Sequence, residues 1–378
     1  MQLTAKTLQG LEQVLAKEIE AIGGNNIQIL KRAVTYEGDQ KLLYRSCYEL
    51  RTAVRILKPF HQFKTKHENH LYKKMKEVDW VSKFGLEQTF VINAVTNSKY
   101  ITHSKYLALK SKDAIVDSFR EVYDRQRPSI DLRNPDFRLN IHLGRDNVCT
   151  LAWDASGETL HKRGYRVESV EAPINEVLAA GMVILSGWKA DRPLVDPMCG
   201  SGTIVIEAAM LANNIPPQRN RQQFGFMKWK DFDAGLWQEV RQEAKERIVT
   251  TKQSIYGYDK DFQAIKAATK NSMAAGLEDH ITLNRQSFDQ VASPSEDGIL
   301  LTNPPYDERL EEEDIFAFYK DMGHVLKHQF EGYDAWLISS NIKAMKKLGL
   351  KPSSKKILYN GALECQFNCY ELYKGSRK

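Results

Sequence analysis

The second half of the chain alternates short, largely apolar segments with longer segments of helical spacing. The apolar segments are Pro193–Val195, Ser254–Tyr258, Ile281–Asn284, Gly298–Leu301 and Ala335–Ser339. A strand that is apolar along its whole length is buried on both faces, and strands that are separated by helices pair in parallel. The pattern predicts an α/β domain whose mostly parallel sheet is covered by helices on both faces.

The end of the chain breaks this alternation. Lys356–Tyr359 and Leu363–Tyr373 are strand-like and are joined by the turn pair Asn360-Gly361, which is typical of a tight hairpin. We expect this hairpin to add an antiparallel strand at the edge of the sheet.

The first apolar strand runs into a turn with two glycines and then into the apolar helix Ile204–Leu211. Glycines remove the side chains that would keep a ligand away, and the N–H groups of a helix N-terminus point at that ligand. A turn of this kind also occurs without any ligand. The candidate binding residues are Asp196, Pro197, Cys199, Gly200, Ser201, Gly202 and Thr203.

The second apolar strand ends at Asp259, and a carboxylate in this position can accept hydrogen bonds from both ribose hydroxyls of an adenosine. The alternative is that Asp259 only caps the helix that follows it. Val205 occupies the place of a third glycine, which disfavours a dinucleotide pyrophosphate, whereas Asp196 suits a ligand with an ammonium group. The pattern therefore favours an aminoacyl nucleoside, and a dinucleotide-dependent oxidoreductase is the least favoured enzyme.

The fourth apolar strand ends in Asn303-Pro304-Pro305-Tyr306. Two prolines cannot continue a central strand, so the chain leaves the sheet at its carboxyl end, where open α/β sheets place their sites. The Asn303 side-chain oxygen and the Pro304 carbonyl can accept hydrogen bonds from an exocyclic amine, and Tyr306 can stack on an extruded base. The alternative is a plain turn without a catalytic role.

The N-terminal half divides into two parts. Residues 1–57 show the strand-helix-strand-strand-helix order of a split βαβ layer, and residues 58–157 form a second α/β module, here called the basic module. The net charge of the chain is +6, yet the segment from Lys58 to Arg145 holds 17 Lys and Arg against 10 Asp and Glu. This regional excess can attract a polyanion, although a solvated basic surface is the alternative.

Two further segments connect these parts to the α/β domain at residues 172–378. Residues 158–171 are interpreted as a linker, in which residues 160–166 carry four cationic or potentially cationic side chains. Residues 213–252 form a long insertion in the α/β domain. We expect Trp229, Phe232 and Trp237 to pin the insertion onto the domain, although aromatic rings among cations can also serve bases and phosphates.

The start of the chain and its cysteines indicate a compartment. The first 24 residues contain no apolar run long enough for a signal peptide or a membrane span. The five cysteines are scattered and lack paired spacing. We therefore expect a cytoplasmic protein with reduced thiols, without a membrane partner and without a metal site.

At this point the sequence resembles a known family. Asp196–Thr203 with Asn303–Tyr306 resembles the Asn-Pro-Pro-Tyr class of S-adenosylmethionine methyltransferases, which modify exocyclic amines of guanine or adenine. Asp131–Asp136 in the basic module resembles part of a THUMP domain. Together they resemble the bacterial family of THUMP-containing ribosomal RNA guanine-N2 methyltransferases. The resemblance implies a Rossmann-like class I methyltransferase sheet preceded by a ferredoxin-like layer and a THUMP RNA-binding domain.

Residue roles follow from this resemblance by position. It implies that Asp259 meets the cofactor ribose and that Asn303 faces the target amine. Many relatives have an acidic residue after the third strand, where this chain has Gln286 and Ser287; either Ser287 serves, or Asp289 is reached by a shifted turn. The residues implied around the methionine part of S-adenosylmethionine are Asp196, Cys199, Gly200 and Gly202, with Asn175 in the segment that borders it.

The sequence therefore favours an enzyme that methylates guanine N2 of structured RNA, ribosomal RNA in particular. Three alternatives stay open: an adenine-N6 methyltransferase of RNA or DNA, a transfer RNA guanine-N2 methyltransferase, and a non-catalytic RNA-binding assembly factor. The resemblance of the basic module to a THUMP domain favours RNA over DNA. The oligomeric state is left open.

Overall fold

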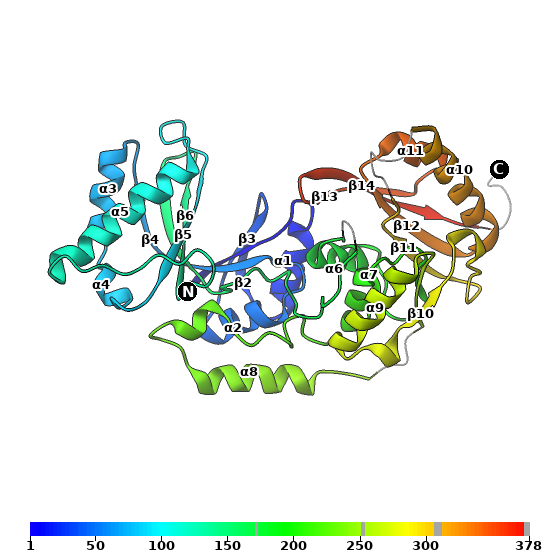
Figure 1. Ribbon diagram of the computed structural model, residues 1–378, viewed down its shortest axis with the longest axis horizontal. Coiled ribbons are helices and arrows are strands. Elements are labelled where there is room, and N and C mark those ends of the chain that lie inside the picture. Colours follow the sequence, from blue (N-terminus) through cyan, green and yellow to red (C-terminus); the bar gives the residue numbers. More distant parts are fainter. Residues whose placement is uncertain (171–172, 251–253, 306–311, 374–378) are drawn as a thin grey trace.

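The computed structural model describes residues 1–170, 173–250, 254–305 and 312–373. Figure 1 shows two halves side by side, each built on its own sheet of seven strands. No helix in the described ranges is long and apolar enough to cross a membrane.

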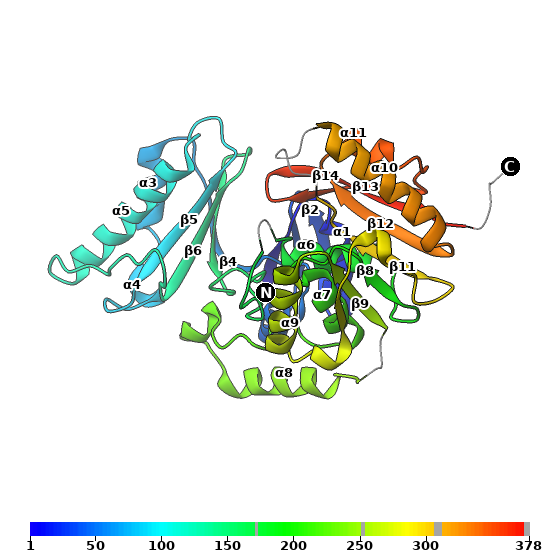
Figure 2. The ribbon, with the colours of Figure 1, turned by 45° about the vertical axis from the view of Figure 1, so that its right-hand side comes forward.

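The N-terminal half is built on a sheet with the strand order β2-β3-β1-β4-β7-β6-β5. Helices α1 (Glu12–Ala21) and α2 (Gln40–Glu49) belong to the first layer, and α3 (Glu68–Lys76), α4 (Trp80–Lys83) and α5 (Ser104–Val122) belong to the basic module. Figure 2 shows α3 and α5 on the outer side of this sheet, away from the C-terminal half. The strands are β1 (Gln2–Lys6), β2 (Asn25–Leu30), β3 (Ala33–Glu37), β4 (Arg55–Lys64), β5 (Phe90–Thr96), β6 (Phe137–Leu143) and β7 (Val148–Asp154).

Strand β4 was not predicted from the sequence, because Pro59 lies in its middle and proline disfavours an interior strand position. Its first residues, Arg55–Leu57, pair with β1, and Leu57–Lys64 pair with β7. The pairing is irregular between Pro59 and His61, where a bulge tolerates the missing N–H of proline. The expected division between residues 57 and 58 thus falls inside a strand that both N-terminal parts share.

The C-terminal half contains the predicted doubly wound sheet, with the strand order β10-β9-β8-β11-β12-β14-β13. All pairs from β10 to β12 are parallel, and β14 is antiparallel to both β12 and β13. The α/β fold and the hairpin are confirmed, with the antiparallel strand one position inside the edge. The strands are β8 (Leu194–Asp196), β9 (Ile255–Asp259), β10 (Thr282–Arg285), β11 (Gly298–Thr302), β12 (Tyr333–Ser339), β13 (Ser354–Asn360) and β14 (Leu363–Glu371).

Helices cover both faces of this sheet. Helices α6 (Glu176–Leu185), α7 (Thr203–Ala212) and α9 (Phe262–Ala275) lie on one face, and α10 (Glu312–Gln329) and α11 (Ile342–Lys347) lie on the other. The strand order reverses between β8 and β11, so the chains that leave these two strands diverge and open a crevice at their carboxyl ends. The fold therefore places both predicted motifs at one crevice.

The insertion, with the short helix η1 (Gly225–Lys228) and α8 (Ala234–Glu246), packs against the first layer. The ring of Phe226 stacks on Tyr44 of α2 at 4.4 Å, and the ring of Trp237 meets Tyr48 edge-on at 5.3 Å. In Figure 1, α8 runs beneath α2. The insertion is pinned by its aromatic rings, as expected, but onto the N-terminal half. The insertion therefore connects the C-terminal half to the N-terminal half.

Candidate functional site

A cavity of about 1530 Å³ opens at the carboxyl ends of β8, β9, β10 and β11. It brings together most of the residues that were selected from the sequence. Gly202 and Asn175 are placed outside its wall, and Tyr306 lies outside the described residues. The predicted residues that line it are Asp196, Pro197, Cys199, Gly200, Ser201, Thr203, Asp259, Ser287, Asn303, Pro304 and Pro305.

The glycine turn is fixed by the end of the neighbouring strand. The Cys199 N–H donates to the Tyr258 carbonyl at 2.8 Å, and the Gly200 N–H donates to Asp259 Oδ2 at 3.0 Å. Gly200 and Gly202 have φ angles of +53° and +83°, a backbone region that side chains disfavour. A Cβ on Gly202 would also approach Ala268 Cβ to 3.0 Å. The turn therefore requires glycine, and Gly202 shapes it without facing the cavity.

Two carboxylates stand at the adjacent strand ends. Asp196 is buried, and burial raises its pKa to about 7, with the nearby Asp259 carboxylate adding to this effect. Hydrogen bonds from the Thr302 hydroxyl at 2.8 Å and the Met198 N–H at 3.2 Å oppose the rise. The Asp259 side chain is bonded to Gly200, and the helix N-cap is Asp261. The interpretation of Asp259 as only a cap is therefore wrong.

Asn303 presents an unusual acceptor to the site. Its Oδ1 atom is buried, and no donor among the described residues reaches it. A buried acceptor without a hydrogen bond costs about 1–3 kcal/mol, so such atoms are rare in folded proteins and call for a partner. Asn303 lines the cavity, which makes a ligand donor the natural partner of this oxygen.

The two alternatives for the position after the third strand come together in the structure. The short helix η3 (Phe288–Gln290) turns the chain so that both Ser287 and Asp289 line the cavity. The Ser287 hydroxyl donates to Asp289 Oδ1. The two side chains thus form one polar group in the wall. Within the described ranges, no cluster of three or more His, Cys, Asp and Glu residues could hold a metal ion.

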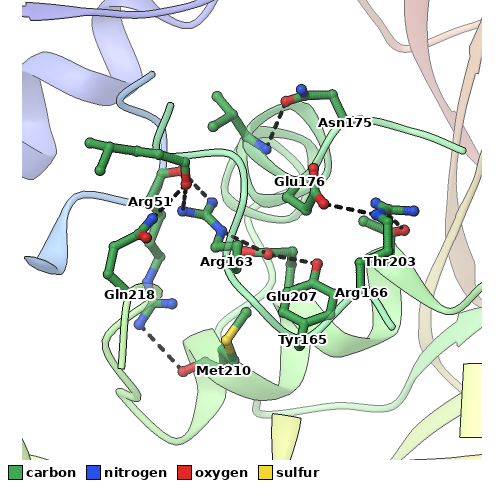
Figure 3. A network of polar contacts seen from close by, with 12 residues as sticks. Arg51, Arg163, Tyr165, Arg166, Asn175, Glu176, Thr203, Glu207, Met210 and Gln218 are labelled. Atoms are coloured by element: carbon green, nitrogen blue, oxygen red, sulfur yellow. Dashed lines mark hydrogen bonds and ion pairs between the residues drawn. The ribbon is translucent and has the colours of Figure 1, made fainter. Parts of the chain in front are cut away.

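The segment that was interpreted as a linker is held by a network of hydrogen bonds and ion pairs, here called the joint (Figure 3). Some of its partners, such as Ser201 and Thr203, line the cavity. The Arg166 guanidinium donates to Glu176 Oε1 at 2.8 Å and to the Ile174 carbonyl at 3.0 Å. It also donates to the hydroxyls of Ser201 at 3.2 Å and Thr203 at 3.0 Å. One side chain therefore fixes the glycine turn and the start of α6 together.

Arg163 of the same segment is buried, with 2% of its surface exposed. Its guanidinium donates to Glu207 Oε1 on α7 at 3.0 Å and to the Arg51 carbonyl of the N-terminal half at 2.6 Å. The Tyr165 hydroxyl also donates to Glu207, at 2.9 Å. Burial raises the pKa of Glu207, and the Arg163 charge opposes this. The joint thus bonds the two halves to each other in the interior.

This joint was not predicted from the sequence, although one signal was present. Glu207 is the single charged residue within the apolar helix Ile204–Leu211, and a carboxylate on a buried helix needs a cationic partner. The need of Glu207 for such a partner implies that one of the arginines in residues 160–166 lies in the interior.

The doubly wound sheet, the glycine turn and the acceptor at the reversal of strand order define a ligand-binding α/β domain of the nucleoside-binding type. Residues 163–368 match the family described as RMKL-like, methyltransferase domain. Residues 2–57 match the RlmL ferredoxin-like domain, and residues 65–154 match the THUMP domain. The chain belongs to the RMKL-like methyltransferase family, which confirms the resemblance.

Relatives agree with this assignment along the whole chain. The chain is 38% identical over 376 residues to the ribosomal RNA large subunit methyltransferase K/L of Syntrophotalea carbinolica, covering 96% of this chain and 52% of that protein. It therefore spans about half the length of this curated relative. The structure of SMU.472, complexed with SAH, has a TM-score of 0.88 at 29% identity and 99% coverage of both chains. A protein described as a possible methylase from Clostridium difficile 630 has a TM-score of 0.88 at 34% identity, covering 100% of this chain and 99% of its own.

We predict that Arg163→Met lowers the free energy of unfolding by about 3–5 kcal/mol, because it leaves the buried Glu207 carboxylate without its charge partner. The double variant Arg163→Met/Glu207→Gln should recover part of this loss, since the uncompensated charge is then gone. Urea denaturation measures both. The control is Lys270→Met, which breaks the exposed Glu168–Lys270 pair and should cost at most about 1 kcal/mol. An Arg163→Met loss no larger than that of the control would contradict the role of the joint.

Proposed function

We propose that the chain transfers a methyl group from S-adenosylmethionine to an exocyclic amine of RNA, namely guanine N2 of ribosomal RNA, in the cytoplasm. The observation that carries the proposal is the buried, unpartnered Asn303 Oδ1 in the wall of the cavity that also holds the glycine turn. A buried acceptor oxygen that lacks a hydrogen-bond partner can accept from the N–H of an amine. The RMKL-like family and the SAH complex of SMU.472 support the donor.

The residues on one side of the cavity fit an aminoacyl nucleoside. Asp196 offers a carboxylate for the ammonium group of the methionine part, and the glycine turn leaves room for its chain. Asp259 faces the same cavity and suits the ribose hydroxyls. The Ser287 and Asp289 pair offers an acceptor for the adenine amine. When bound, S-adenosylmethionine supplies a methyl group that its sulfonium already activates.

The task of the protein is then to position the amine and accept its hydrogen bonds. Asn303 Oδ1 and the Pro304 carbonyl would hold the amine hydrogens and favour a pyramidal nitrogen whose lone pair can attack. The amine proton can leave to water after the transfer, so no strong base is required. Pro305 borders the cavity, and the stacking role of Tyr306 stays a prediction.

The N-terminal half suits RNA as the partner. Its residues 65–154 match the THUMP domain, and the segment around them carries the regional excess of positive charge. The match to the K/L relative supports ribosomal RNA. Adenine N6, transfer RNA and a non-catalytic role are the outcomes that a product analysis separates from this proposal.

We predict that Asn303→Ala lowers kcat by about 100-fold or more, because it removes an interaction that strengthens in the transition state. Binding of S-adenosylhomocysteine, measured by calorimetry, should be nearly unchanged. Asn303→Asp keeps an acceptor oxygen and should retain more activity than Asn303→Ala.

The assay follows tritiated methyl transfer to ribosomal RNA from a strain without this enzyme, with nucleoside analysis of the product. N2-methylguanosine is expected. Wild-type activity in Asn303→Ala would remove Asn303 from the mechanism. Label in N6-methyladenosine would move the proposal to adenine, and label on a ring carbon or ribose would reject the exocyclic amine.

We predict that affinity for S-adenosylhomocysteine falls as the pH drops below 7. The raised pKa of Asp196, about 7, means that the carboxyl becomes neutral below that pH and no longer pairs with the ligand ammonium. The loss should approach roughly tenfold per pH unit below the pKa of Asp196. Calorimetry from pH 5.5 to 8.5 measures this. Asp196→Asn should bind weakly with little dependence on pH below 7, and an unchanged profile in that variant would exclude Asp196 as the ammonium partner.

A further inference from the structure

The methyltransferase domain carries a second concentration of positive charge, outside the basic module. Six lysines and no acidic residue lie between residues 341 and 363. The basic module, by comparison, gains its excess over a segment about four times as long, from Lys58 to Arg145. We call the six residues the lysine strip: Lys343, Lys346, Lys347, Lys351, Lys355 and Lys356.

Five of the six lysines lie on the α10–α11 side of the sheet, whereas Lys356, next to Lys355 on β13, points to the other face with Leu358. Lys343, Lys346 and Lys347 are spaced three and four residues apart on α11 and therefore share a helix face. Lys351 lies in the loop that follows, and Lys355 lies on the edge strand β13. All of these are exposed, and Lys356 is partly exposed. The surface is therefore open to a large partner along its length.

Four of the six lysines have no acidic partner in the part of the chain that the structure describes. Among the described residues, no carboxylate forms an ion pair with Lys346, Lys351, Lys355 or Lys356. In the basic module several cations are paired, for example Lys74 with Glu77, Lys76 with Glu121 and Arg120 with Asp117. Surface cations without an acidic partner keep their full electrostatic attraction for a polyanion.

The strip is continuous with the acceptor side of the cavity. Lys343 and the residues that start α11 line the same cavity as Asn303, and so do Asn360 and Leu363 at the tip of the β13–β14 hairpin. Lys343 at one end of the strip therefore reaches the cavity wall, and so does the tip of the hairpin whose strand β13 carries Lys355 and Lys356. In Figures 1 and 2 the tip of the β13–β14 hairpin points toward the N-terminal half, so the part of the cavity wall that this tip forms lies toward that half.

We propose that the lysine strip binds the phosphates of the RNA strand that flanks the target nucleotide. The inference rests on the proposed function and adds a second RNA contact on the methyltransferase domain itself. The strip places phosphate-binding cations beside the cavity, where the target base must enter. Phosphate contacts fix the position of a strand without reading its sequence, so the strip sets where the nucleotide enters and leaves the choice of base to the cavity.

The test compares two fourfold variants of the full chain. In the strip variant, Lys346, Lys347, Lys351 and Lys355 are changed to Gln; Lys343 is kept because it lines the cavity. In the matched control, Lys17, Lys189, Lys245 and Lys266, all exposed, are changed to Gln, so that the net charge of the two variants is equal. Binding of fluorescein-labelled large-subunit ribosomal RNA is measured from 50 to 300 mM KCl, together with methyl transfer.

In the strip variant we expect the slope of log affinity against log salt to become shallower by about 3, as the loss of four phosphate contacts predicts. The KM for RNA should rise about tenfold or more, while kcat and the affinity for S-adenosylhomocysteine stay within twofold. The control should change the slope by less than 1. Equal slopes in the two variants, or a fall in kcat without a rise in KM, would overturn the proposal.

The outcome separates this inference from the function on which it rests. A wild-type chain that neither binds nor methylates RNA refutes the proposed function. If the wild-type chain methylates RNA and the strip variant has the same KM for RNA, the role of the lysine strip is refuted and the proposed function stands.

Discussion

The buried Arg163 guanidinium links the two halves of the chain in the interior, where water cannot replace it. It bonds a carboxylate on α7 and a backbone carbonyl of the N-terminal half, and both partners are inaccessible to water that could replace it. Three residues further on, Arg166 bonds the glycine turn. The same short segment thus connects the N-terminal half to the glycine turn in the cavity wall. A movement of one half relative to the other would therefore change the position of that turn.

The parallel sheet and its crevice could be predicted from the sequence because they follow from local patterns. Continuous apolar strands, the two glycines of the turn and the double proline after β11 each limit the backbone on their own. Asp196, Asp259 and Asn303 then meet in one cavity because parallel strands bring their carboxyl ends to one edge.

The features that were missed depend on contacts between segments distant in sequence. Strand β4 is held by partners on both sides, which outweighs the local effect of Pro59. The arginines of residues 160–166 look like a solvated charge run until Glu207 is known to lie opposite them. The insertion likewise has a clear aromatic pattern, but nothing within it identifies α2 as its partner.

Strand β4 also determines how the N-terminal half can come apart. Because one strand supplies pairing partners to β1 on one side and to β7 on the other, separating the two layers would expose two rows of unpaired backbone groups. Such bare edges readily recruit strands from other chains. We therefore expect the first layer and the basic module to unfold as one cooperative unit, and a cut between them to give fragments with unpaired strand edges that associate with other chains.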